Sequence, residues 1–206
     1  MKILKASALS LLTLGFFACG GSSSDETAKD LLSEISESLE ELDNEAETWS
    51  TKSDNENFEI DIPAHMQIMD NLNAEASLQY GYAEQVGDEV LEHYVIVLNY
   101  PKEDLKADGF EDMDILTYNK MPIESLSGGL DEYELITTEP KVEDVNGLKC
   151  VKNEMRGSLG EVNIYYQVGV YESDKSFYQL VTWCIEGQKG EFKEDMERII
   201  NSFKEI

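Results

Sequence analysis

Cysteine and histidine are the residue types here that most often carry nucleophilic or metal chemistry, and the chain has few of each. The two histidines, His65 and His93, lack the H-x-x-x-H or H-x-H spacing typical of a zinc site. No G-x-S-x-G segment marks a nucleophilic serine, and no glycine-rich loop is suited to holding a phosphate. The sequence therefore predicts structural roles for both histidines, with no catalytic residue, no metal site and no cofactor.

The third chemically distinctive residue is Cys19, which follows a short apolar segment. Lys2 and Lys5 precede an uncharged run of 13 residues, 6–18, the arrangement of a secretory signal. The run is too short to span a bilayer as a helix, which needs about 20 residues. Phe16-Phe17-Ala18-Cys19 resembles the lipobox of bacterial lipoproteins, although phenylalanine replaces the usual leucine. This resemblance implies cleavage after residue 18 and lipidation of Cys19; the alternative is an ordinary signal peptide with a chance cysteine.

The residues after Cys19 bear on where the anchored protein lies. Residues 20–26 are Gly-Gly-Ser-Ser-Ser-Asp-Glu, which resembles the surface-export signal of Bacteroidetes-type lipoproteins. The resemblance implies a cell-envelope protein held by the lipid on Cys19 in the outer membrane, on its outer face. An orientation towards the periplasm is the alternative.

The charge of the chain restricts its partners. The chain has 43 Asp and Glu against 16 Lys and Arg, which gives a formal net charge of −27. Removal of the signal peptide with Lys2 and Lys5 changes the net charge to −29. Such a surface repels nucleic acid and anionic headgroups, so we expect no nucleic-acid partner. The densest acidic cluster has no EF-hand spacing and is interpreted as a solvated helix start, with specific calcium binding as the alternative; it consists of Asp108, Glu111, Asp112 and Asp114.

Three regions follow from hydrophobic patterning. Residues 1–18 are the signal peptide, and 19–57 form a tether with an acidic amphipathic helix at 28–47 and a polar boundary at 48–57. Residues 58–206 form the folded domain. Strands in it are expected where apolar and polar residues alternate, at 58–62, 66–69, 77–83, 91–100, 133–138, 141–145, 147–156, 161–172 and 177–186.

Two helical patterns complete the domain. One covers 110–121, is broken or restarted at Pro122 and ends at Gly128-Gly129, and the other covers 189–205. The strand at 91–100 is apolar on both faces, which is typical of a central strand covered on both sides. The predicted fold class is therefore α+β, an antiparallel sheet sandwiched between helices.

The last three strands read as a meander with two different faces. Val151, Val168 and Val181 represent an almost purely apolar face, which we expect to carry the terminal helix. The opposite face is mixed, and it supplies a candidate binding groove for a peptide or glycan unless a helix covers it. The candidate residues are Lys152, Tyr165, Gln167, Tyr171 and Tyr178.

The meander register also bears on Cys150 and Cys184. With a turn centred in 157–160, Cys150 opposes Gln167, which in turn opposes Thr182. The two cysteine Cα atoms are then on the order of 11 Å apart. A disulfide needs less than about 7 Å, so two free thiols are expected.

Three short sequence segments within residues 58–206 resemble segments of a known family. The strand 58–63 (FEIDIP), the strand 94–98 (YVIVL) and the closing helix 196–204 (MERIINSFK) resemble those of PsbP-like proteins, which include the photosystem subunit PsbP and the envelope lipoprotein DcrB. The resemblance implies an α/β/α sandwich used as a binding or assembly module. It implies no reaction, and no family site residue carries over.

The function expected from the sequence is an envelope-anchored, non-catalytic lipoprotein that binds a protein or assists an assembly. The alternative is a ligand-binding lipoprotein that captures a small molecule or glycan for uptake. The partner in either case is an envelope protein or a small ligand, in addition to the membrane reached through Cys19.

The lipid anchor gives a first testable prediction. Mass spectrometry of the protein from its own cells should show a mature chain that begins at Cys19 and carries fatty acyl mass, while Cys19→Ser should lose that mass and leave the membrane fraction. An intact Met1, or a mature start elsewhere without acyl mass, contradicts lipidation.

Overall fold

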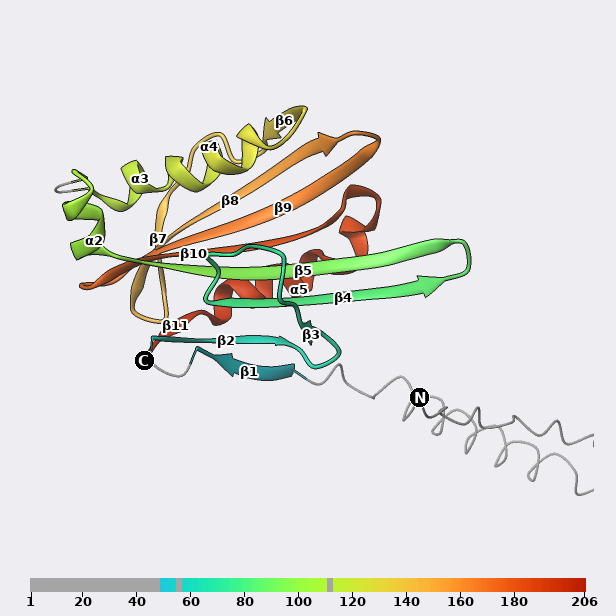
Figure 1. The fold of residues 1–206 in the computed structure, drawn as a ribbon, viewed down its shortest axis with the longest axis horizontal. Helices are drawn as coiled ribbons and strands as arrows, with labels where there is room; N and C mark the ends of the chain where they lie inside the picture. The colour runs from blue at the N-terminus through green and yellow to red at the C-terminus, as the bar shows by residue number, and fades with distance from the viewer. Residues whose placement is uncertain (1–48, 55–56, 111–112) are drawn as a thin grey trace, which may run out of the picture. The chain divides into compact units, whose positions relative to one another are not determined.

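A computed structural model describes residues 49–206, apart from 55–56 and 111–112. The expected signal peptide and the amphipathic helix at 28–47 lie outside the described residues. The main sheet has the strand order β3-β4-β5-β10-β9-β8-β6, and β7 also pairs with β8 (Figure 1). All of its pairings are antiparallel. Its strands are β3 (Gln67–Ile68), β4 (Leu78–Val86), β5 (Glu89–Pro101), β6 (Glu132–Leu135), β7 (Val142–Val145), β8 (Leu148–Leu159), β9 (Val162–Glu172) and β10 (Ser176–Ile185).

A small second sheet corrects the expected boundary at 48–57. It contains β1 (Trp49–Ser53), β2 (Phe58–Pro63) and β11 (Lys204–Glu205), in the order β1-β2-β11. The β1 strand pairs antiparallel with β2, and the guanidinium of Arg198 lies 3.9 Å from the ring centre of Trp49. The folded unit thus begins before Phe58. Its first strand looks like a linker in the sequence because an exposed edge strand is mostly polar.

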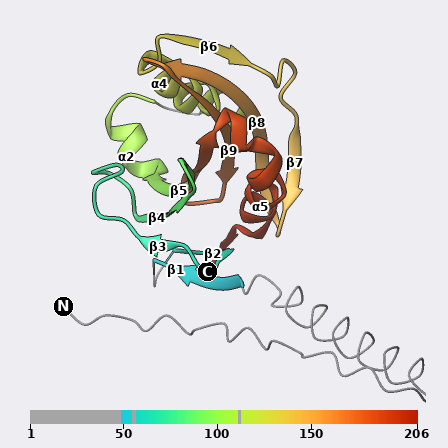
Figure 2. The ribbon, with the colours of Figure 1, turned by 90° about the vertical axis from the view of Figure 1, so that its right-hand side faces the viewer.

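Helices cover both faces of the main sheet, which confirms the predicted α+β sandwich. The helices α2 (Lys102–Ala107), α3 (Ile115–Tyr118) and α4 (Lys120–Gly128) lie on one side of β5, β9 and β10. The short η1 (Glu186–Gln188) leads into α5 (Lys189–Ser202) on the other side (Figure 2). Pro122 restarts the helix, which is one of the two outcomes expected, since α4 begins two residues before it at Lys120. It lies in the first turn of α4, where its missing N–H costs no hydrogen bond.

The acidic segment before α3 is a helix start, as the sequence predicts for Asp114. The carboxylate of Asp114 accepts a hydrogen bond from the backbone N–H of Thr117 at 2.7 Å. This bond lowers the pKa of Asp114. Glu111 and Asp112 lie outside the described residues.

The expected position of the terminal helix is wrong. The apolar meander face, with Val151, Val168 and Val181, packs against Leu105, Ile115 and Tyr118 of α2 and α3 and against side chains of α4. The α5 helix instead covers the opposite, mixed face with Phe192, Met196, Ile199 and Ile200. Alternation assigns residues to a face, but both faces of this sheet are buried, and alternation does not say which helix covers which.

The meander register is partly as expected. Gln167 opposes Thr182, as predicted, but Cys150 opposes Tyr171, four residues from the expected partner. The turn is Gly160-Glu161 between the paired residues Leu159 and Val162, and Gly160 has a φ of +60°. Both cysteines are free, as predicted. The corrected register sets their Cα atoms on the order of 20 Å apart.

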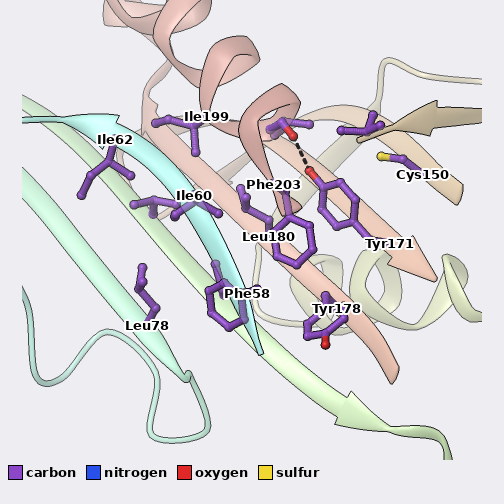
Figure 3. Packing of buried hydrophobic residues seen from close by; sticks show 14 of the residues in the cluster. Phe58, Ile60, Ile62, Leu78, Cys150, Tyr171, Tyr178, Leu180, Ile199 and Phe203 are labelled. Atoms are coloured by element: carbon purple, nitrogen blue, oxygen red, sulfur yellow. Dashed lines mark hydrogen bonds between the residues drawn. The ribbon is translucent and has the colours of Figure 1, made fainter. Parts of the chain in front are cut away.

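Tyr171 fastens α5 to the sheet. Its hydroxyl donates a 2.6 Å hydrogen bond to the carbonyl of Ile200, and its ring stacks on Phe203 with the ring centres 4.1 Å apart (Figure 3). The ring bends over Gly169, since a Cβ built there lies 2.6 Å from the Tyr171 hydroxyl oxygen. Phe203 in turn stacks on Phe58 of β2, which joins both ends of the domain in one core.

This contact gives a second prediction. Gly169→Ala should displace the Tyr171 ring and weaken its bond to Ile200, which lowers the free energy of unfolding by about 2 to 4 kcal/mol. Gly190→Ala is the matched control, because a Cβ there meets nothing within 4 Å. Urea denaturation measures both variants. Equal stability of the two proteins would contradict the packing described for Tyr171.

Candidate functional site

The mixed sheet face proposed from the sequence is not an open groove. Four of its five candidate residues are 0–3% exposed beneath α5 and the small sheet: Tyr165, Gln167, Tyr171 and Tyr178. Their polar atoms are bonded within the domain, with Tyr178 donating to Glu205 at 2.8 Å and Gln167 donating to Tyr165 at 3.2 Å. These residues form a core layer, and only Lys152 is partly exposed.

Tyr165 belongs to a charged network that ties α5 to β8 and β9. Its hydroxyl donates to the carboxylate of Glu154, and Lys189 and Lys193 each lie 3.6 Å from that carboxylate. Lys189 also lies 4.0 Å from the centre of the Tyr165 ring. Partial burial acts to raise the pKa of Glu154, but the Tyr165 bond and the two ammonium charges outweigh it, so the net pKa is lowered. Glu154 is therefore a carboxylate at neutral pH and holds the helix in place.

Lys152 and Gln167 do meet at a small polar hollow, which we call the edge pocket. It has a volume of about 240 Å³ and is lined by Thr137, Lys152, Glu154, Gln167, Glu197 and Asn201, among others. It lies at the outer edge of β8. Residues 152–154 pair with β9 on one side but have no ladder partner on the other, between Val151, which pairs with β7, and Met155, which pairs with β6.

The segment between β6 and β7, which contains Thr137, and the end of α5 close the edge pocket. The backbone N–H of Glu154 donates to the Thr137 hydroxyl at 2.9 Å, and the ammonium of Lys152 donates to Asn201 at 2.8 Å and to Glu143 at 2.9 Å. The pocket therefore has polar walls whose hydrogen bonds are already partly satisfied.

A larger uncovered region lies on the α4 side of the sheet. In Figure 1 the β4–β5 and β8–β9 hairpins extend past the end of α4, so no helix of the described residues lies over the sheet there. Strand alternation and register bring seven apolar and aromatic side chains together on this face. We call it the sheet-end face, and it consists of Tyr94, Tyr133, Leu159, Val162, Ile164, Trp183 and Ile185.

None of these seven side chains is fully buried. Tyr133 and Leu159 are more than half exposed, at 57% and 56%, and Val162 is 47% exposed. At the inner border of this face the ring of Tyr94 stacks on that of Trp183, with the ring centres 5.3 Å apart. Sequence reasoning missed this surface because it placed the terminal helix over it. The sequence did contain a signal for it: the helical pattern ends at Gly128-Gly129, so that helix is too short to cover the full length of the strands.

The histidines and cysteines are not arranged for catalysis. His93 and Cys184 are cross-strand neighbours under α5, but burial raises the pKa of Cys184 to about 12. Burial, followed by the charge of His65, lowers the pKa of His93 to about 3. Its Nε2 lies 2.8 Å from the Thr182 hydroxyl. At neutral pH the site therefore holds a protonated thiol and a neutral imidazole, which suits a structural role.

Two further properties concern the described part of the chain. Within it, no three His, Cys, Asp or Glu side chains are grouped closely enough to hold a metal ion. None of its helices has both the length and the apolar composition needed to cross a membrane.

The comparisons with known proteins bear on the fold. No family model matches the sequence, and no curated protein matches it significantly. Among solved structures, cyanobacterial PsbP (CyanoP) from Synechocystis sp. PCC 6803 aligns with a TM-score of 0.50 and 16% identity, over 79% of this chain and 95% of that chain.

Two other solved structures resemble the chain less well. LpqN, described as involved in cell envelope biogenesis of Mycobacterium tuberculosis, has a TM-score of 0.49 and 10% identity, over 78% of this chain and 87% of that one. A putative regulator of unknown function from Pseudomonas aeruginosa has a TM-score of 0.48 and 8% identity, over 75% and 94%. The likeness to CyanoP is the one that supports an argument: the described residues adopt a PsbP-like α+β fold.

Proposed function

We propose that this chain is an envelope-anchored lipoprotein whose PsbP-like domain is a non-catalytic protein-binding or assembly-accessory module. The observation that carries the binding role is the sheet-end face. Contiguous exposed apolar side chains are uncommon on monomeric proteins and mark interaction sites more often than scattered single ones do. A protein partner covering Tyr133, Leu159 and Val162 would complete the burial that α4 leaves unfinished.

The envelope anchor rests on the sequence around Cys19. The lipobox-like segment ends at that cysteine, and 29 residues separate it from Trp49, where the first described strand begins. The Ser-rich, acidic start of this spacer favours the outer face of the outer membrane. A lipid at one end and an apolar recognition surface on the domain suit a protein that acts while tethered.

The non-catalytic part of the proposal rests on the state of the candidate nucleophiles. Burial is the main cause that raises the pKa of Cys150 to about 12, as it does for Cys184. Neither thiol is therefore appreciably ionised at neutral pH, and the thiolate is the reactive form. His93 is buried and bonded to Thr182, so it is not placed to activate an external substrate.

A second candidate function is favoured by the edge pocket. A domain that captures a small molecule or glycan would use hydroxyl, amide and charged groups such as those of Thr137, Lys152 and Asn201. A thermal-shift screen of sugars and metabolites separates the two candidates. A ligand that raises the melting temperature of the wild type by several degrees, but not that of Lys152→Ala, favours capture over protein binding.

Site-specific cross-linking tests the protein-binding role. A photoreactive amino acid at Leu159 should link the acylated protein to one defined envelope protein in living cells. The same group at Val142, a similarly exposed apolar residue on β7, is the control and should give no such product. Identical product patterns at the two positions, or none at Leu159 in several growth states, would contradict a role for the sheet-end face.

A further inference from the structure

The sheet-end face has an acidic border. Glu161 lies in the hairpin turn beside Val162, and Glu92 lies on the same face as Tyr94. Asp131 is at the same hairpin, where its carboxylate accepts a 2.7 Å hydrogen bond from the N–H of Gly160. The apolar centre is thus surrounded by carboxylates.

Positive charge is missing from this face. Beyond the row of Tyr94 and Trp183, no described strand residue that faces this side is a lysine or arginine. Arg156 lies on the opposite face of β8, where its guanidinium bonds Glu134 and lies 3.3 Å from Glu186. It is therefore occupied by two carboxylates and does not neutralise the border.

This combination of charge and apolar surface excludes several occupants. A second copy would bring two acidic borders together on chains that each carry −27. A bilayer rich in anionic lipids would be repelled in the same way. The partner that gains most has apolar side chains for the centre and cations for the border, since complementary charges guide association and suppress wrong partners.

We propose that the sheet-end face binds a cationic amphipathic polypeptide segment, in which apolar side chains are flanked by lysine or arginine. This inference rests on the proposed protein-binding function and names the chemistry of its partner. Leu159 and Val162 contact the apolar side chains, while Glu92 and Glu161 pair with the flanking cations.

Two synthetic peptides of about 14 residues test the charge preference, one alternating leucine with lysine and one alternating leucine with glutamate. The protein is the full mature chain with Cys19→Ser, so that no lipid or detergent competes for the peptides. We expect the lysine peptide to bind and the glutamate peptide not to bind. Leu159→Ser with Val162→Ser should abolish binding of the lysine peptide.

A charge-matched pair of variants separates the site from general attraction to an acidic protein. Glu92→Lys with Glu161→Lys should weaken binding of the lysine peptide about tenfold at low salt, and high salt should remove this difference because the border charges are screened. Glu103→Lys with Glu139→Lys makes the same change in net charge at exposed positions outside the sheet-end face. This control should bind as the wild type does. Thermal unfolding checks that both variants are folded.

Each other outcome overturns the inference. Equal weakening in both double variants means general charge attraction, and binding of the glutamate peptide removes the cationic preference. Sedimentation that shows a dimer abolished by Leu159→Ser with Val162→Ser assigns the face to a second copy. If Leu159 cross-links to an envelope protein whose binding is unchanged by Glu92→Lys with Glu161→Lys, protein binding stands and the cationic partner is excluded. If the lysine peptide does not bind and Leu159 cross-links to no envelope protein, both the cationic partner and the protein-binding function are excluded.

Discussion

The structure depends on one constraint: the central strands are apolar on both faces, so both faces of the sheet must be covered. Val95 and Val97 of β5 point to the α5 side, while Ile96 and Leu98 point to the α2–α4 side. On the first side α5 and the small sheet complete the cover, and Phe203 joins Phe58 to Tyr171 there. Because β11 pairs with β2, the last residues of the chain hold its first described strands in place.

The second side is covered less completely, and this difference produces the proposed function. Three short helices pack on Val168 and Val181, but α4 ends at Gly128 and the β8–β9 hairpin continues beyond it. The strands keep their alternation to the tip, so apolar side chains such as Leu159 and Val162 remain without a helix above them among residues 49–206 as described. A surface of this kind costs solubility unless a partner uses it, and the surrounding carboxylates offset that cost.

Much of the fold could be predicted because local patterns decide it. Alternation located the strands, the two-sided apolar run identified β5 as central, and Asn146-Gly147 marked the turn between β7 and β8, where both residues have positive φ. Decisions that depend on distant segments were beyond the sequence. Gly157 and Gly160 are equally good turn residues in the sequence, but only Gly160 lies in the turn. Gly157 lies within β8, where Leu130 packs in the space that a side chain at this position would occupy. The tyrosines of the candidate face looked like a groove, since their partners Glu154, Glu205 and the Ile200 carbonyl come from elements that only folding brings near.

The proposed binding role requires the sheet-end face to be open in the free protein and covered in the complex. Hydroxyl-radical footprinting with mass spectrometry measures this directly, with buried Tyr166 on the same sheet side as the internal reference. We expect rapid oxidation of Tyr133 and Leu159 in the free chain, and strong protection of both when the cross-linked partner is present. If Leu159 is as protected as Tyr166 in the free protein, or stays fully reactive in the complex, the sheet-end face is not the binding surface.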